Sequence, residues 1–249
     1  MQGAASGGSS GGSADRSTSS AGKPSDAPSR ASRPRDAATL IITRRRAGRV
    51  EVLMGERHQR HSVHPQRYVF PGGKVDRYDS RVRAVAPVPP TVMDLLTRRA
   101  TPGRARALIA AVVRETFEET GLIVGAPDPE PHKPVHEHWQ PFFATGMAPD
   151  FTRIAYVARA VTPVGRPVRF NVRFFMIDAA HVQGDMGGNG ELLNLQYVPV
   201  TEGQSLDMPN ITRRILAHVD EITRDGVPVE RLTVPCFRYG GIAHRRVEE

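Results

Sequence analysis

The feature that most constrains the fold is a helix predicted over residues 101–121. Thr101 can cap its first turn with a side-chain oxygen, and Pro102 suits the first helical position. Gly121 is a typical residue just beyond the end of a helix. The segment between these signals, GRARALIAAVVRETFEET, is therefore expected to form one continuous helix.

This helix carries three glutamates close to its end. Glu115, Glu118 and Glu119 stand at positions i, i+3 and i+4, which places their carboxylates on one face. Each pair of like charges costs a few tenths of a kcal/mol, roughly, in an isolated helix. Mg²⁺ or Mn²⁺ is the natural counter-ion, because hard divalent cations prefer oxygen ligands. Such a triplet is more often a solvated face, so its neighbours in the sequence decide the interpretation.

The rest of the chain predicts a mixed arrangement of strands and helices. Residues ATLIITRR and RVEVLMGERH, joined at Ala47-Gly48, read as a hairpin, and Tyr68–Phe70 reads as a short strand that Pro71-Gly72-Gly73 ends. Further strands are expected at 122–124, 139–145, 151–161, 170–178 and 194–200, a short helical stretch in TVMDLLTRRA, and a last helix near 209–223. The fold class is therefore α/β.

Composition divides the chain into one domain and two terminal segments. Residues 1–36 are rich in Gly, Ser, Ala and Pro and are expected to be a disordered tail without an export signal. Residues 37–235 are expected to form the domain, with an insertion at about 80–101, and residues 236–249 a C-terminal extension. The single cysteine, Cys236, excludes an internal disulfide and favours a cytoplasmic location.

Two segments together resemble the signature of a known family. FPGGKVDRYDS and RETFEETGL resemble the two halves of the Nudix box, G-x5-E-x7-R-E-U-x-E-E-x-G-U, in which U is a bulky apolar residue. The positions that match are Gly73, Asp79, Arg114, Glu115, Glu118, Glu119, Gly121 and Leu122. The resemblance implies an α/β/α sandwich with a mixed sheet, in which a loop-helix-loop motif holds Mg²⁺ against a diphosphate.

The resemblance also implies a role for each matching residue. Glu118 and Glu119 would be the principal metal ligands, and Glu115 would be a ligand or would support one. Arg114 would orient the carboxylates through a salt bridge to Glu118. Gly72 and Gly73 would let the loop turn toward the helix and the substrate.

The sequence departs from the box at three places. Aspartate replaces glutamate at position 79, Thr116 stands where a larger apolar residue is usual, and residues 80–113 separate the two halves. The split is similar to that of the subgroup that includes mammalian Nudix motif 19 and its bacterial relatives, which are associated with coenzyme A diphosphatase activity. Residues 162–175 and LDMPNITRRIL resemble further segments of this subgroup, whereas its coenzyme A signature upstream of FPGG is not met.

The expected activity is metal-dependent hydrolysis of a phosphoanhydride bond in a nucleoside-diphosphate-linked or coenzyme A-like small molecule. Arg57 is the first candidate to bind substrate phosphate, because it leads into the loop before FPGG. The other candidates for this role are Arg67, Arg169 and Arg173.

Glu191 is either a remote metal ligand or general base, or a surface residue. The histidines at 58, 61 and 64 fit no closed zinc site, and those at 132, 136 and 138 are expected in loops.

Two other functions stay open at this point. A Nudix-fold module could bind a nucleotide for regulation without cutting it, although such proteins are expected to lose box carboxylates. The net charge of +8 would also suit nucleic acid, but the sequence shows no motif for specific nucleic-acid binding. We expect a monomer or homodimer that acts on a small molecule, without a membrane partner.

Overall fold

The computed structural model describes residues 33–60, 63–128, 130, 136–226, 233–239 and 244–248. Within these residues the main sheet has nine strands, in the order β11-β10-β7-β8-β1-β2-β3, with β4 paired to β1 and β9 to β2. The strands are β1 (Arg35–Arg46), β2 (Arg49–Arg57), β3 (Tyr68–Val69), β4 (Gly72–Lys74), β7 (Ala155–Val161), β8 (Phe170–Asp178), β9 (Leu192–Pro199), β10 (Pro235–Tyr239) and β11 (His244–Glu248). A small second sheet pairs β5 (Gly125–Pro127) with β6 (Met147–Pro149).

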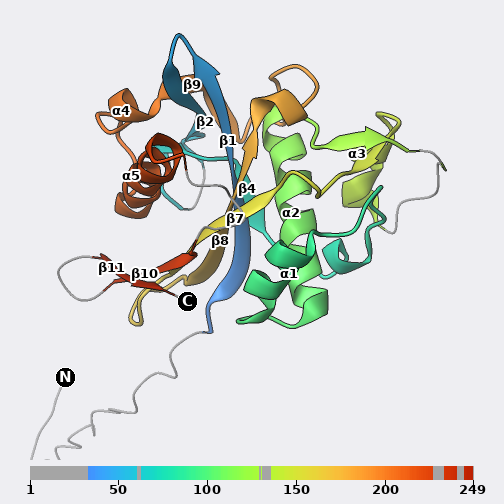
Figure 1. The fold of residues 1–249 in the computed structure, drawn as a ribbon, viewed down its shortest axis with the longest axis horizontal. Coiled ribbons are helices and arrows are strands. Elements are labelled where there is room, and N and C mark those ends of the chain that lie inside the picture. Colours follow the sequence, from blue (N-terminus) through green and yellow to red (C-terminus); the bar gives the residue numbers. More distant parts are fainter. Residues whose placement is uncertain are drawn as a thin grey trace, which may run out of the picture. The chain divides into compact units, whose positions relative to one another are not determined.

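Helices cover both faces of the main sheet (Figure 1). Three of them, α1 (Pro90–Thr97), α2 (Pro102–Thr120) and the short α3 (Gln140–Phe143), lie on one side, and α4 (Val200–Gly203) and α5 (Asn210–Arg224) lie on the other. Single 3₁₀ turns occur at η1 (Asp79–Arg81), η2 (Glu137–Trp139) and η3 (Ala179–His181). The expected α/β sandwich with a mixed sheet is therefore confirmed.

The central strand β1 explains why the core has two halves. It runs parallel to β8 and antiparallel to β2, so the sheet is mixed. Successive side chains of a strand point to opposite faces. Leu40 and Ile42 accordingly pack in the core beneath α1 and α2, whereas Ile41 packs in the core beneath α5. The buried apolar run of β1 thus serves both layers, as expected for a strand covered on two faces.

Most of the predicted elements are present. The first hairpin turns at Ala47 and Gly48, both with positive φ (49° and 78°). The predicted short strand after the histidine-rich loop is β3, and the predicted last helix is α5. Strands at 170–178 and 194–200 correspond to β8 and β9.

The strand predicted at 139–145 is wrong, because this segment forms η2 and α3. Pro141 stands in the first turn of α3, where its missing N–H costs no helical hydrogen bond. The buried Trp139 and Phe142 are three residues apart, which is a helical rather than a strand spacing. Residues 122–124 contribute only an isolated bridge from Ile123 to Gln183, and β7 starts at Ala155 instead of residue 151.

The domain boundaries differ from those expected at both ends. Strand β1 begins at Arg35, so the last two residues of the predicted tail lie in the sheet, and residues 1–32 lie outside the described residues. Residues 236–238, expected in a C-terminal extension, pair with β7 in the main sheet. The insertion at about 80–101 contains α1, whose Val92 and Leu96 are buried in the same core as α2. None of the helices in the described part of the chain is both long and apolar enough to cross a membrane.

Candidate active site

Helix α2 places the three glutamates in its last two turns. Its start is fixed by the side chain of Thr101, which accepts a hydrogen bond from the Arg104 N–H at 3.3 Å, as the N-cap prediction required. Its end is fixed by Gly121, which adopts φ +73° and donates its N–H to the Phe117 carbonyl. Both predicted helix signals are therefore confirmed, and the last turns are held at a defined place against the sheet.

The guanidinium of Arg114 is the hub of the site. Its Nε and Nη2 donate to the two carboxylate oxygens of Asp79 at 3.0 and 3.1 Å. Its Nη1 donates to Glu115 at 2.9 Å and to Glu118 at 3.1 Å, which is the expected i,i+4 ion pair. Nη2 also donates to the Lys74 carbonyl at 3.1 Å. One buried side chain thus joins both halves of the split motif.

Asp79 is completely buried and holds its neighbours in place without facing solvent. Besides Arg114, its oxygens accept the indole N–H of Trp139 at 3.0 Å and the backbone N–H of Asp76 at 2.7 Å. A carboxylate with this many donors is a structural anchor. The role of Trp139 could not be predicted, since no local signal in the sequence connects it with a residue sixty positions earlier in the chain.

The glycine pair at the start of β4, Gly72 and Gly73, makes close contact with two of the glutamates; the two residues lie in a strand and do not form the predicted turn. The Gly72 N–H donates to the Glu119 carboxylate at 2.7 Å. A Cβ atom at position 73 would lie 2.3 Å from a carboxylate oxygen of Glu115, so only glycine leaves room for it. Gly72 itself has φ +148°, and a Cβ there would meet the Ala38 carbonyl at 2.3 Å. The backbone of Gly72 and Gly73 therefore packs directly against the carboxylates of Glu119 and Glu115 on α2.

Arg57 and Glu191 lie beside these carboxylates. Arg57 pairs in register with Leu192 between β2 and β9, and the N–H of His58 donates to the Glu191 carbonyl at 3.0 Å. Burial lowers the pKa of Arg57, and the negative charges of Glu119, Glu191 and Glu115 act against this. The structure thus brings together Arg57 and Glu191, which the sequence had suggested separately.

Burial raises the pKa values of the site carboxylates, and the charges of neighbouring carboxylates add to this. Burial, together with the charges of Glu118 and Asp79, raises the pKa of Glu115 to about 7 despite Arg114. Burial, with the charges of Glu115 and Glu191, raises the pKa of Glu119 to about 8 despite the Gly72 N–H and Arg57. Burial also raises the pKa of Glu118.

The pKa of Arg114 is raised as well, but for a different reason. Burial alone would lower it, but the hydrogen bond to Asp79 and the charges of Glu115, Asp79 and Glu118 raise it. Arg114 is therefore a permanent cation. The three glutamates at the end of α2 are therefore candidates to hold a cation.

The donor set fits a hard divalent cation. Among the described residues, no three His, Cys, Asp or Glu side chains converge as a ready metal cage. In this structure Arg114 occupies oxygens of Glu115 and Glu118, and the Gly72 N–H occupies one of Glu119. Mg²⁺ keeps several waters and needs only one or two carboxylates together with substrate phosphates. Glu115, Glu118 and Glu119 could supply these one or two carboxylates once they are deprotonated.

Two histidines expected in a loop border the site. His138 lies 3.9 Å from Asp76, and its charge, when protonated, favours ionised Glu118. His136 stacks on the ring of Tyr78 with a centroid distance of 4.0 Å. His61 and His132 lie outside the described residues.

The other arginine candidates are held elsewhere. Arg173 is buried and pairs with Asp36 at 2.6 Å. Arg169 donates to the carbonyls of Thr162 and Pro163, and Arg67 pairs with Asp207 at 3.5 Å. The prediction that these three residues bind substrate phosphate finds no support in their contacts, since their guanidinium groups serve the local fold.

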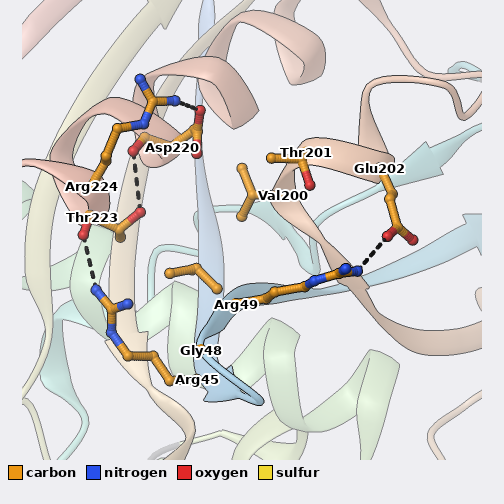
Figure 2. A pocket seen from close by; sticks show the side chains of 10 residues that line it. Arg45, Gly48, Arg49, Val200, Thr201, Glu202, Asp220, Thr223 and Arg224 are labelled. Carbon is orange, nitrogen blue, oxygen red and sulfur yellow. Dashed lines mark hydrogen bonds and ion pairs between the residues drawn. The ribbon is translucent and has the colours of Figure 1, made fainter.

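A separate cavity of about 520 Å³ lies between the β1–β2 turn, α4 and the end of α5. Figure 2 shows that its arginines are turned toward partners at the rim and do not converge on the centre. Arg45 donates to the Thr223 carbonyl at 2.9 Å and Arg49 pairs with Glu202 at 3.0 Å, while Arg224 pairs with Asp220. This cavity is on the face of the sheet opposite to α2 and is distinct from the carboxylate site.

Comparisons with known proteins agree with this geometry. No family model matches the sequence, and no curated protein matches it. The chain is similar to the crystal structure of a NUDIX hydrolase from Alicyclobacillus acidocaldarius, with a TM-score of 0.58 and 27% identity over 74% of this chain and 90% of that one. It also matches a MutT protein from Bacillus halodurans (TM-score 0.47, 14% identity, 85% of this chain and 97% of that one).

The fold is that of the Nudix hydrolases, and the first of these similarities, taken with the site geometry, supports placing the chain in the Nudix superfamily. The match to the MutT protein is too weak to add to this conclusion. The sheet and the helices that cover it thus support the general class of Nudix hydrolase.

Proposed function

We propose that the protein is a divalent-metal-dependent hydrolase that cuts a phosphoanhydride bond in a nucleoside-diphosphate-linked or coenzyme A-like small molecule. One observation carries this proposal: Glu115, Glu118 and Glu119 gather around Arg114 and the Gly72-Gly73 pair, where burial and the neighbouring carboxylates raise the pKa values of Glu115 and Glu119. A cation would stabilise the ionised form of these buried carboxylates, and a cation bound there attracts phosphate.

Each residue of the site has a role in this proposal. Glu115, Glu118 and Glu119 would hold Mg²⁺ or Mn²⁺, which supplies polarisation of the phosphoryl oxygens and acidification of a water molecule. Arg114 orients the carboxylates of Glu115 and Glu118. The Gly72 N–H orients Glu119.

Arg57 would neutralise a substrate phosphate at the edge of the site. Its position next to Glu119 and Glu191 keeps a positive charge close to the carboxylates. Phosphoryl transfer depends mainly on positioning and on neutralisation of charge, so these groups are sufficient for the reaction.

The coenzyme A-like part of the proposal rests on the split of the motif. The insertion between Asp79 and Arg114 folds as η1 and α1 and packs beside α2, which leaves Asp79 in contact with Arg114. A split that preserves this ion pair is consistent with the subgroup that the sequence resembles.

The test is a panel of diphosphates: coenzyme A, NADH, ADP-ribose, nucleoside triphosphates, dinucleoside polyphosphates and a nucleotide-sugar, each with Mg²⁺ or Mn²⁺. Products are identified by mass for the wild type, for Glu118→Gln, and for Glu202→Gln, which changes an exposed glutamate on α4. Metal-dependent cleavage that is lost only in Glu118→Gln supports the proposal. Binding of a nucleotide without cleavage by the folded, metal-supplied wild type would replace it with a sensor function.

A further inference from the structure

The glycine-rich loop before β9 is attached to the end of α2. The Gly187 N–H donates to the Thr120 carbonyl at 2.7 Å, and the Asn189 N–H donates to the Glu118 carbonyl at 2.8 Å. Carbonyls in the last turn of a helix have no partner within the helix. The loop supplies these partners and so fixes the turn that carries Glu118 and Glu119.

The contact is too close for a side chain to intervene. Gly188 has φ +111°, and a Cβ atom there would lie 2.2 Å from the Glu119 carbonyl oxygen. The glycines of residues 184–190 are, in the sequence alone, only the signal of a turn, but in the structure this loop packs against the end of α2. The loop and the helix end form one unit.

The side chain of Asn189 continues this contact to Glu191. Its Oδ1 accepts the Glu191 N–H at 3.0 Å, and its Nδ2 donates to the Glu191 carboxylate at 3.2 Å. The carbonyl of Glu191 in turn accepts the N–H of His58, next to Arg57. Glu191 is thus held on its N–H, its carbonyl and its carboxylate.

We propose that Asn189 is a positioning residue, which ties the end of α2 to Glu191 and through Glu191 orients Arg57 for a substrate phosphate. The proposal rests on the proposed function of the same site. The backbone N–H of Asn189 binds the helix end, and its side-chain amide binds the carboxylate of Glu191, whose carbonyl accepts the N–H of His58, the residue after Arg57. A substitution at 189 therefore removes the second contact and leaves the first.

The charge of Glu191 acts on Arg57 and on Glu119, the two groups that Asn189 would influence through Glu191. It favours the charged form of Arg57 and opposes ionisation of Glu119. If the amide of Asn189 no longer held the carboxylate, the exposed side chain of Glu191 would sample several rotamers, and its negative charge would no longer be held at one place beside Arg57. The binding of phosphate should weaken more than the chemical step slows.

The test is a double-mutant cycle with Asn189→Ala, Glu191→Gln and the double variant. Binding of methylenediphosphonate with Mg²⁺ is measured by calorimetry, and KM and kcat are measured on the compound that the wild type cuts. Asn189→Ala should raise the Kd of the probe and the KM about 5- to 10-fold while kcat changes less than about 3-fold. The double variant should bind like Glu191→Gln alone, because Asn189 acts through Glu191.

Asn210→Ala, at the exposed start of α5, is the matched control and should bind the probe like the wild type. Unchanged probe binding in Asn189→Ala, or effects of the two single variants that simply add, would overturn the proposal. A wild type that binds the probe and cuts no diphosphate would refute the proposed function, and the binding cycle would still test Asn189.

Discussion

Arg114 holds both oxygens of Asp79, at 3.0 and 3.1 Å, although an entire insertion with its own helix separates the two residues in the chain. The pair is buried on both sides. A parallel two-point contact of this kind fixes direction as well as distance. The two halves of the motif are therefore joined in space by an ion pair, and the insertion is accommodated beside it.

Arg114→Lys should destabilise the protein, because lysine keeps the charge but cannot reproduce the fork of contacts to Asp79, Glu115 and Glu118. Breaking a buried pair costs roughly 3–5 kcal/mol, and the retained charge should limit the loss here to about 2–4 kcal/mol. Urea unfolding measures this loss in the free energy of unfolding. Arg49→Lys, at an exposed pair with Glu202, should cost less than about 1 kcal/mol. Equal losses in the two variants would show that the Arg114 hub is not structural.

Gly73→Ala should remove activity while leaving the fold intact. The added methyl group would lie 2.3 Å from a carboxylate oxygen of Glu115, and that side chain must move away from Arg114 and from the proposed metal. We expect a loss of about 100-fold or more in kcat/KM, the size typical of a displaced charged group in an active site. Gly103→Ala, in the first turn of the same helix, has nothing within 4 Å and should keep full activity. If both variants are equally active, Glu115 does not need the space at position 73.

Thr116→Val should stabilise the protein. The Thr116 hydroxyl is fully buried and has no hydrogen-bond partner among the described residues, so an isosteric methyl group removes an unsatisfied polar atom. The expected gain is about 1 kcal/mol, seen as a rise of about 2–4 °C in Tm.

Thr120→Val, four residues later on the same helix, is the control for Thr116→Val. Its hydroxyl donates to the Thr116 carbonyl at 2.6 Å and accepts the Leu122 N–H at 3.2 Å, so the same substitution should lower the Tm. A fall in Tm for both variants would contradict the interpretation of Thr116.

Stability without divalent metal should fall as the pH rises from about 5 to 8. Burial raises the pKa of Glu119 to about 8 and that of Glu115 to about 7, above the ordinary value of 4.5. The folded state therefore binds more protons than the unfolded state in this range, and the free energy of unfolding decreases with pH. Mg²⁺ should restore stability at pH 8, because it neutralises the same carboxylates.

Glu119→Gln isolates the contribution of one carboxylate to this pH dependence. Glutamine keeps an oxygen that can accept the Gly72 N–H and removes the charge. In metal-free buffer the variant should be more stable than the wild type at pH 8.5 by at least about 1 kcal/mol, and equally stable at pH 5. Thermal unfolding of both proteins across pH checks this, and identical pH profiles would refute it.

Local signals in the sequence were sufficient to predict helix α2 and strand β1. Thr101 and Gly121 bound α2 because capping depends on residues within one turn of the helix end. The apolar run that contains Leu40, Ile41 and Ile42 predicted a strand, and the glutamate spacing predicted a common face of α2.

The contacts that complete the site join residues far apart in the chain, and no local pattern encodes them. The indole of Trp139 reaches Asp79 from a segment that was expected to be a strand. The loop at 184–190 gave only turn signals, although its backbone holds Glu118. Arg173 carried the charge expected of a phosphate ligand, but the sequence could not show that Asp36 already binds it.

The most direct test of the central claim is hydrolysis of the diphosphate panel in ¹⁸O-labelled water, with Mg²⁺ or Mn²⁺ and with the metal removed by chelator. We predict one ¹⁸O atom in one phosphate-containing product for the wild type with metal, and none for the wild type without metal or for Glu118→Gln. The position of the label also identifies the phosphorus that water attacks. Cleavage that continues without divalent metal, or at full rate in Glu118→Gln, would contradict a reaction carried by these carboxylates.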